Sequence, residues 1–341
     1  MNMAEVGIKD VAAKAGVSTA TVSQALRNPG RVADATREKV LAAIEEVGYT
    51  PNKLGVSLRT SKTGNIVVII PDVADSYNFG IIKAIEQVAH ARGYSVLLGD
   101  TQCSPLRERE YAAMVKSRQA DGIILLSHRL PFDTDGGDAE SNRLPPIVNG
   151  GEFTGVRGVP AVTIDDAKAG EDATQHLIDL GHSNIAVITG DMDCPTSQNR
   201  LQGFKQAMEK SGLSVNEKNI IKADYTVEDG EAAVKKLLIL KTRPTAIFCF
   251  SDEIALGAMH SLQMHGFDVP SDISIIGFDD IKFAKYFSPA LTTIAQPAEL
   301  IGETCANLLM NLLDEKAPEK DRYILEHELI VRGSTGPAPG A

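Results

Sequence analysis

The sequence predicts a small all-α head followed by an α/β core made of two doubly wound parallel-sheet lobes. Three short amphipathic helical patterns fill the first 48 residues, and from residue 65 onward short apolar runs alternate with helical stretches. Continuous apolar strands between helices are typical of a parallel sheet that is covered on both faces. A faint internal repeat indicates two similar lobes, because residues 65–72 and 184–191 agree at five of eight positions.

The first two helical patterns predict a helix-turn-helix. An apolar stripe from Ile8 to Ala15 ends at Gly16, which supplies a tight turn. Ser18 is placed to cap the next helix, about 19–26, by accepting a hydrogen bond from a backbone N–H. Two helices joined by a short glycine-containing turn and braced by a third make this motif. An ordinary small helical domain fits the same spacing equally well.

The third helical pattern covers about residues 34–47 and stops at Gly48. Its predicted inward residues are Val40, Leu41, Ile44 and Val47. The stretch that follows lacks an apolar face and is rich in Pro, Gly, Ser and Thr, which is a linker composition.

The predicted domains follow from these patterns. Residues 1–48 form the helix-turn-helix domain, 49–64 the hinge or linker, 65–335 the two-lobed core and 336–341 a disordered tail. Within the core, the N-lobe takes about 65–165 and 295–331, and the C-lobe about 166–294. The last helix, near 298–314, and the strand at 323–331 return to the N-lobe because they come too late for the C-lobe.

Composition bounds the class of protein. The 341 residues are 43% hydrophobic and contain no apolar run of the roughly 18 residues that a membrane span needs. The N-terminus lacks the basic and apolar regions of a secretory signal. Four cysteines without a CxxC pair argue against a disulfide framework or zinc site. We therefore expect a cytoplasmic protein with no membrane contact.

Charge is distributed unevenly along the chain. Residues 1–62 carry nine Lys/Arg and six Asp/Glu, a net charge of +3, whereas the remaining residues carry a net charge of −14. A basic head on an acidic body permits phosphate contact at one end only.

Catalysis has little support in the sequence. No glycine-rich phosphate loop follows the first strand, and the seven histidines show no metal-ligand spacing. We expect no enzyme activity, no catalytic residues, no metal and no cofactor.

Polar residues at the ends of the apolar strands indicate a ligand site instead, because open α/β sheets bind ligands beyond the carboxyl ends of their strands. These residues are Asp72, Asp165, Asp191, Ser251, Asp252, Asp279 and Asp280. With Arg200, Tyr77 and Tyr225 they suit a neutral polyhydroxylated or heterocyclic ligand between the lobes. The alternative for each strand-end Asp is that it only caps the next helix.

The head and several later segments closely resemble the lactose-repressor/galactose-repressor family. The matching segments are Ile8–Ala12, Val17–Leu26, Thr36-Arg37, Gly48–Asn52, Ser57–Arg59, Gly277–Asp279, Leu291–Ile294 and Val331–Thr335. Residues 127–133 and 307–313 look most like the cytidine-repressor branch of this family. The resemblance spans nearly the whole chain and implies a periplasmic-binding-protein-like core.

The resemblance implies a homodimeric transcriptional regulator whose second helix lies in the major groove of a palindromic operator. The implied base-reading residues are Thr19, Ala20 and Gln24. Other DNA contacts carried over are Ser18, Thr21, Ser23, Asn28, Tyr49, Asn52, Leu58 and Arg59. Many relatives carry Arg where Gln24 stands, and Gln pairs with adenine where Arg pairs with guanine. We therefore expect an adenine at that operator position.

The hinge of the family implies a role for Leu58, which would wedge into the minor groove at the operator centre. Gly55 and Val56 lower the helix propensity of this segment. A plain flexible tether is the alternative.

In the core, the family's ligand positions map to Tyr77, Asn78, Asp165, Thr196, Arg200, Tyr225, Ser251, Asp252 and Asp279. Tyrosines at the two wall positions would sandwich a planar ring, which favours a nucleoside such as cytidine. The same architecture responding to ribose, another sugar or a nucleobase is the alternative. A solute-binding protein shares the two-lobed core, but it would carry a signal peptide and no helix-turn-helix.

Overall fold

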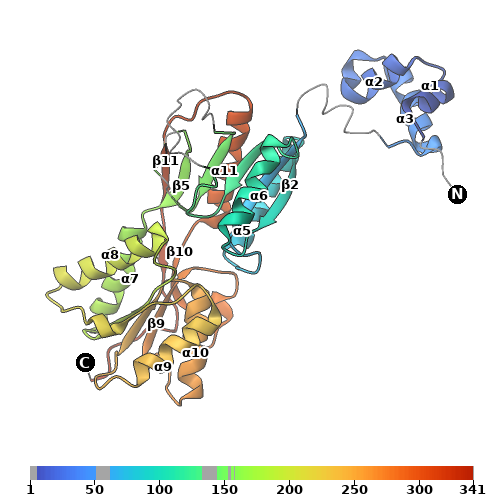
Figure 1. Ribbon diagram of the computed structural model, residues 1–341. Coiled ribbons are helices and arrows are strands. Elements are labelled where there is room, and N and C mark those ends of the chain that lie inside the picture. The colour runs from blue at the N-terminus through green and yellow to red at the C-terminus, as the bar shows by residue number, and fades with distance from the viewer. Residues whose placement is uncertain (1–5, 51–61, 133–143, 153–154, 157, 341) are drawn as a thin grey trace. The chain divides into compact units, whose positions relative to one another are not determined.

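The computed structural model describes residues 6–50, 62–132, 144–152, 155–156 and 158–340. The chain divides into two compact units, Met1–Thr63 and Gly64–Ala341. Figure 1 shows the helical first unit and the α/β second unit. Within the described residues, no helix combines the length and apolarity needed to cross a bilayer.

The first unit is a three-helix domain. Its helices are α1 (Ile8–Ala15), α2 (Thr19–Arg27) and α3 (Asp34–Val47), with a short 3-10 turn η1 (Pro29–Arg31) after α2. The fully packed residues are Val11, Ala12, Val22, Ala25, Val40 and Ala43. All three predicted helices are confirmed.

In the head, the predicted cap and turn are present, but one predicted inward residue of α3 is exposed. The Ser18 hydroxyl accepts a hydrogen bond from the Thr21 backbone N–H at 3.1 Å, and Gly16 adopts a positive φ of 67°. The prediction that Leu41 points inward is wrong, because its side chain is 49% exposed. At 100° per residue, Val40 and Ala43 form the inward stripe and Leu41 falls beside it.

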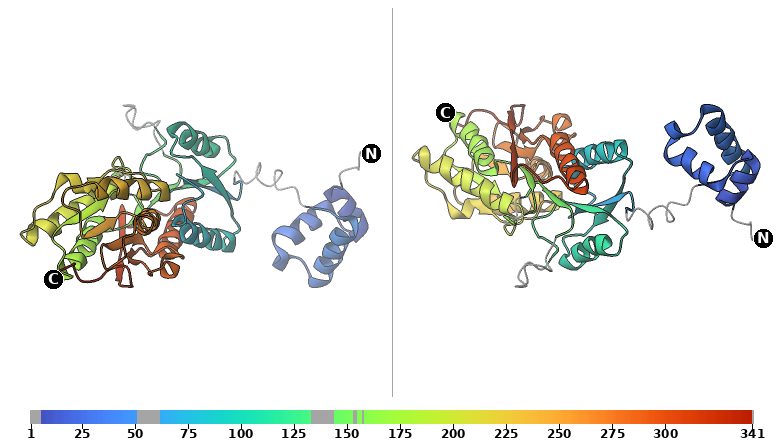
Figure 2. Two further views of the ribbon diagram at one scale, coloured as in Figure 1. Left: turned by 90° about the horizontal axis from the view of Figure 1, so that it is seen from below. Right: turned by 90° about the horizontal axis from the view of Figure 1, so that it is seen from above.

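The first lobe of the second unit is a parallel six-stranded sheet with strand order β11-β5-β4-β3-β1-β2. Its strands are β1 (Asn65–Ile70), β2 (Ser95–Asp100), β3 (Gly122–Leu125), β4 (Ile147–Gly150), β5 (Ala161–Ile164) and β11 (Arg322–Leu325). Its helices are α5 (Asn78–Ala91), α6 (Pro105–Lys116) and α11 (Ala298–Leu313). Both views of Figure 2 show α6 on one side of this sheet and α5 with α11 on the other.

Alternation along β1 explains why both faces are covered. Ile66, Val68 and Ile70 pack with α5 and α11, whereas Val67 and Ile69 pack with α6. Successive side chains of a strand point to opposite faces, so an unbroken apolar run needs helices on both sides.

The second lobe repeats this arrangement with strand order β12-β10-β9-β8-β6-β7. Its strands are β6 (Ile185–Ile188), β7 (Ile220–Ile221), β8 (Ala246–Cys249), β9 (Ser274–Asp279), β10 (Thr292–Ala295) and β12 (Glu328–Ile330). Its helices are α7 (Asp166–Asp179), α8 (Pro195–Lys210), α9 (Val227–Leu238) and α10 (Asp252–Met264), with 3-10 turns η2 (Glu217–Asn219) and η3 (Ala284–Tyr286). The predicted pair of doubly wound lobes is confirmed.

The chain crosses between the lobes after β5, after β10 and again between β11 and β12. The predicted single strand at 323–331 in the first lobe is therefore wrong. It is two strands, because polar Glu326 and His327 interrupt the apolar run and β12 pairs antiparallel with β10 in the second lobe. Strand β10 itself was not predicted, since its threonines hide the apolar pattern.

The predicted disordered tail at 336–341 is also wrong for its described residues, 336–340. The Gly336 carbonyl lies 3.1 Å from Nε2 of His182, and the Gly336 N–H donates to the Ser274 hydroxyl at 3.0 Å. The Ala338 N–H donates to the Leu180 carbonyl at 2.9 Å. These partners of the second lobe hold the tail, which composition alone does not reveal.

Helix pairs inside each lobe meet closely at glycines. A Cβ on Gly257 of α10 would overlap the Val227 carbonyl at the start of α9, and one on Gly302 of α11 would overlap the Ile81 carbonyl of α5. The backbones of each helix pair therefore pack directly against each other, which leaves little room for one helix to shift on its partner.

Replacing Gly257 with Ala is expected to destabilise the second unit by about 1–3 kcal/mol, because the added methyl forces the two helices apart. Urea denaturation followed by circular dichroism measures the change. Gln263→Ala, at an exposed position of the same helix, should stay within about 0.5 kcal/mol. Equal losses in both variants would contradict the close-packing argument.

Candidate functional site

The predicted DNA-contacting residues of the head lie on and beside α2. Thr19, Ala20 and Asn28 are exposed, whereas Thr21, Ser23, Gln24 and Tyr49 are half-buried. Asn28 ends the helix, with its N–H donating to the Gln24 carbonyl at 2.8 Å. Side chains at positions 19, 20, 23 and 24 share one helical face, which is the geometry of a recognition surface. Predicted contacts at Asn52, Leu58 and Arg59 lie outside the described residues.

Arg200 is the central charge of the site between the two lobes. From α8 its Nε donates to Oδ1 of Asp166 at 2.9 Å, and its Nη1 donates to the Phe250 carbonyl at 2.6 Å. Its guanidinium also lies 3.6 Å from the centre of the Phe278 ring. These three contacts orient a side chain that is 6% exposed.

Several acidic and phenolic groups share the field of this one cation. Burial raises the pKa of Tyr77, Tyr225, Glu152 and Asp279, and the positive charge of Arg200 opposes the rise at all four. The pKa of Glu152 reaches about 7. Because Arg200 acts on all four groups, Tyr77 and Glu152 of the first lobe lie near Tyr225 and Asp279 of the second.

On the first-lobe side, Tyr77 anchors a polar chain that reaches the second lobe. The Tyr77 hydroxyl donates to Oε1 of Gln296 at 3.1 Å, and Nε2 of Gln296 donates to Oδ1 of Asp279 at 2.8 Å. Asp279 ends β9 with a φ of 112°, a conformation that non-glycine residues rarely adopt. This turn directs its carboxyl inward, where it is 8% exposed.

A second contact between the lobes lies beside this chain. The backbone N–H and the hydroxyl of Ser76 both donate to Oε1 of Glu253, at 3.1 and 2.7 Å. Nearby, burial raises the pKa of Asp75 to about 6. The lobes are thus joined by polar contacts that separation would exchange for water.

On the second-lobe side, Tyr225 forms an apolar wall. Its hydroxyl hydrogen-bonds to the Ser197 hydroxyl at 2.6 Å, and its ring lies against Gly190, where any Cβ would overlap it. Thr196 donates to Oε1 of Glu152 at 2.7 Å. Both tyrosine hydroxyls therefore have protein partners, and both rings pack against the core of the second lobe.

Three predicted ligand residues make hydrogen bonds within the protein. Asp165, which is exposed, caps α7 through the Lys168 N–H, and Ser251 caps α10 through the Ile254 N–H. The amide of Asn78 donates to Asp75. The contacts of Asp165 and Ser251 match the capping alternative for strand-end residues.

Asp252 has a similar internal role. It is fully buried and accepts hydrogen bonds from the Thr293 hydroxyl at 2.6 Å and the Ile281 N–H at 2.8 Å. Both carboxylate oxygens therefore have protein partners, and they hold the turn that carries Asp279.

Sequence reasoning missed several residues of this site. They are Asp75, Ser76, Glu152, Asp166, Ser197, Glu253 and Gln296. Asp166 follows the predicted Asp165 directly, and Glu152 comes two residues after β4. A search one or two positions beyond each strand would have found both of them.

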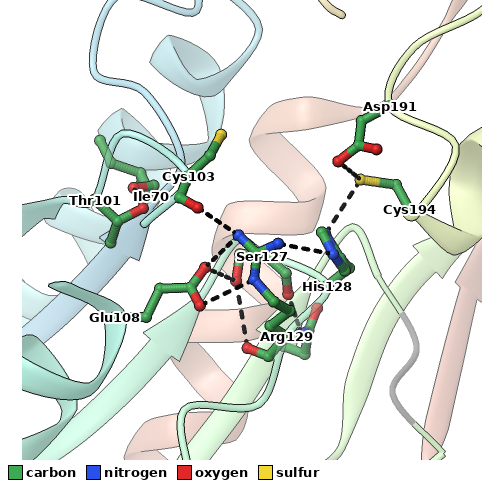
Figure 3. A network of polar contacts seen from close by, with 10 residues as sticks. Ile70, Thr101, Cys103, Glu108, Ser127, His128, Arg129, Asp191 and Cys194 are labelled. Atoms are coloured by element: carbon green, nitrogen blue, oxygen red, sulfur yellow. Dashed lines mark hydrogen bonds and ion pairs between the residues drawn. The ribbon is translucent and has the colours of Figure 1, made fainter. Parts of the chain in front are cut away.

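A further network joins the lobes through His128 and Cys194 (Figure 3). Nδ1 of His128 lies 3.1 Å from Sγ of Cys194, which lies 3.8 Å from Oδ2 of Asp191. Ligand atoms of these three residues all lie within 4.8 Å of one another, a set that could hold a metal ion. The sequence spacing gave no sign of this cluster.

The arrangement around His128 favours hydrogen bonding over metal ligation. Nη1 of Arg129 lies 3.4 Å from Nε2 of His128, and because Arg only donates, Nε2 accepts and Nδ1 carries the proton toward Cys194. Glu108 holds Arg129 in place. Burial lowers the pKa of His128 and raises that of Cys194, so both groups stay neutral at pH 7.

Comparison with known proteins agrees with this architecture. Residues 7–52 match the model of bacterial regulatory proteins of the lacI family, and residues 174–335 match the periplasmic binding protein-like domain. The HTH-type transcriptional repressor CytR of Escherichia coli (strain K12) is 41% identical over 332 residues, which cover 97% of this chain and 97% of CytR.

Solved structures extend the likeness to three dimensions. The lac repressor dimer bound to operator and an anti-inducer aligns with a TM-score of 0.84 and 26% identity, covering 98% of this chain and 100% of that one. The regulator CelR in complex with cellobiose aligns with a TM-score of 0.72 and 32% identity, covering 96% and 99%.

A helix-turn-helix head and a two-lobed core with a buried polar site define a ligand-responsive DNA-binding regulator. The chain belongs to the lacI family of bacterial regulatory proteins, whose members are transcriptional regulators and not enzymes.

Removing Arg200 should destabilise the core strongly. Arg200→Ala leaves Asp166, whose side chain is 3% exposed, without its cation, and the loss of one partner from a buried pair costs about 3–5 kcal/mol. Urea denaturation without effector measures this loss.

A matched control is available on the same two helices. Lys210 of α8 pairs with Glu171 of α7 at 2.7 Å, and its side chain is 62% exposed. Lys210→Ala should cost at most about 1 kcal/mol. A comparable loss in both variants would show that the buried pair is not a special constraint.

Proposed function

We propose that this chain is a homodimeric, cytoplasmic repressor that binds a palindromic operator and is controlled by a nucleoside, with cytidine favoured. The observation that carries the proposal is the buried polar site around Arg200, flanked by two tyrosine rings whose hydroxyls already have protein partners. The proposed division of labour assigns operator reading to 1–48, the hinge to 49–64 and effector binding to the core.

Charge around the site supports a neutral ligand. Glu152, Asp166 and Asp279 are carboxyl groups in the field of Arg200, which is already paired with Asp166, and Asp75 lies near two further acids, Glu253 and Asp72. A phosphate would add negative charge to this surplus of acids. Carboxylates accept hydrogen bonds from hydroxyl and amino groups, so the site suits a sugar or a nucleoside and disfavours a nucleotide.

The tyrosine walls favour a planar ring over a bare sugar. Tyr77 comes from the first lobe and Tyr225 from the second, so a base held between them would tie the lobes together. The 41% identity to CytR over nearly the whole chain supports the same choice. The remaining ligand positions proposed from the sequence are Asn78, Asp165, Thr196, Ser251, Asp252 and Asp279, of which Asp165, Ser251 and Asp252 would act by supporting the others.

Control of DNA binding follows from the contacts between the lobes. A ligand that binds one lobe arrangement more tightly shifts the balance between arrangements by its difference in affinity. In a dimer, that shift would change how the two heads meet the operator, with Leu58 as the proposed minor-groove wedge.

Fluorescence anisotropy on the upstream promoter fragment tests the proposal, at several salt concentrations and with or without cytidine. We expect tight, salt-steep binding that cytidine releases. Binding that ignores cytidine but responds to ribose, adenosine or a free base would retain the repressor and replace the effector. Absence of sequence preference at every salt concentration would overturn the proposal.

Gln24 is expected to read an adenine in each half-site. Gln24→Ala should reduce discrimination at that one base pair by about 1–3 kcal/mol and leave the other positions unchanged. Anisotropy titrations with all four bases at the position measure this effect.

Thr21→Ala is the control, because the loss of a proposed phosphate contact should lower the affinity for every DNA sequence by the same factor. If Gln24→Ala also lowered affinity uniformly, Gln24 would be a backbone contact and the adenine assignment would fail.

A further inference from the structure

One buried polar atom stands out in the described part of the chain. Oε2 of Glu152 is the buried side-chain oxygen or nitrogen there that has no hydrogen-bond partner. Glu152 is 9% exposed, and its other oxygen, Oε1, accepts from the Thr196 hydroxyl at 2.7 Å. Buried polar atoms nearly always have partners, so an orphaned acceptor indicates a donor that binds from outside the protein.

The position of this carboxyl group is well defined. The Glu152 N–H donates to Oδ1 of Asn149 at 3.1 Å, and Nδ2 of Asn149 donates to the Ser127 carbonyl at 2.9 Å. Glu152 therefore extends from the end of β4 on a hydrogen-bonded support. Its partner Thr196 belongs to α8, so the carboxyl group lies where the two lobes meet.

The groups that face Glu152 place it inside the effector site. Asp166 and Arg200 act on its charge, and its charge in turn acts on Cys194 and Tyr225. A planar ring stacked on Tyr225 would therefore bring its edge toward Glu152. Hydroxyls of an attached sugar would have Asp279 and Gln296, on the Tyr77 side, as partners.

We propose that Oε2 of Glu152 accepts a hydrogen bond from the exocyclic amino group of an aminopyrimidine nucleoside and so selects cytidine over uridine. This inference rests on the proposed function and names the chemical group that the site reads. Cytosine carries an amino donor where uracil carries a carbonyl acceptor, and carboxylates accept from that amino group. The carbonyl of uracil in the same place would face the ionised carboxylate, and two acceptors cannot form a hydrogen bond with each other.

Protonation of Glu152 changes which pyrimidine it can bind. Burial raises the pKa of this carboxyl to about 7, so both forms are populated near neutral pH. The ionised form accepts from the amino group of cytosine, whereas the protonated form can donate to the carbonyl of uracil. Cytidine and uridine should therefore respond to pH in opposite directions.

Isothermal titration calorimetry with the full-length protein measures both affinities across this range. From about pH 6 to about pH 8, we expect cytidine to bind about tenfold more tightly and uridine about tenfold more weakly, as the ionised fraction rises. Parallel trends for the two nucleosides, or no trend, would overturn the proposal. This test needs no variant.

Glu152→Gln provides the second measurement. The amide is not ionisable and can donate to the uracil carbonyl, so we expect the cytidine-to-uridine affinity ratio at pH 8 to fall at least about tenfold. Both pH trends attributed to Glu152 should disappear. Opposite pH trends that persist in this variant would overturn the proposal, because they would arise from other groups with a raised pKa, such as Asp75 and Asp252.

Glu171→Gln is the matched control, because it makes the same chemical change on α7 in a pair with Lys210 away from the site. It should leave the nucleoside ratio unchanged. An unchanged ratio in Glu152→Gln would overturn the inference while cytidine still controlled DNA binding. If the wild-type protein bound neither nucleoside, the proposed effector itself would fail.

Discussion

The buried guanidinium of Arg200 is the interaction on which the core most depends. It joins three separate parts of the second lobe: Asp166 at the start of α7, the Phe250 carbonyl after β8 and the Phe278 ring on β9. A buried charge is costly unless it is paired and hydrogen-bonded, and Arg200 has both kinds of partner. The same cation limits the mutual repulsion of the carboxyl groups that line the site. Stability of the lobe and the chemistry of the site therefore rest on one side chain.

Packing inside the lobes and contact between them differ in kind. Within a lobe, helix pairs touch backbone to backbone at glycines such as Gly257 and Gly302, and β1 is buried on both faces. Between the lobes, the described contacts include polar pairs such as Ser76 with Glu253 and Cys194 with His128, beside apolar packing of Tyr77 and Leu325 on the second-lobe core. Close-packed interiors resist deformation, whereas water can replace a polar pair at little cost. We therefore expect movement between the lobes rather than within them.

Apolar periodicity predicts the architecture well because each lobe is built from fully buried strands. It fails where polar residues sit in regular structure, as with the threonines of β10, and where a strand changes lobe at Glu326 and His327. For the site, strand ends predict the right neighbourhood but not which carboxyl points inward. Asp165 and Asp166 are adjacent acids, and only the second reaches Arg200, because a helix turns successive side chains by about 100°. Contacts across the lobes, such as Glu152 with Thr196, depend on tertiary placement that no local pattern encodes.

The late return of the chain to the first lobe has a consequence for how the protein is made. Helix α11 covers the face formed by Ile66, Val68 and Ile70, and β11 completes the edge beside β5. Both come from residues 298–325, near the C-terminal end. On a ribosome the head can fold early, but the face of β1 that α5 and α11 share stays only partly covered, by α5, until almost the whole chain has been translated. The nascent first lobe thus exposes apolar surface and an unpaired β5 edge through most of its synthesis, which makes it prone to aggregation.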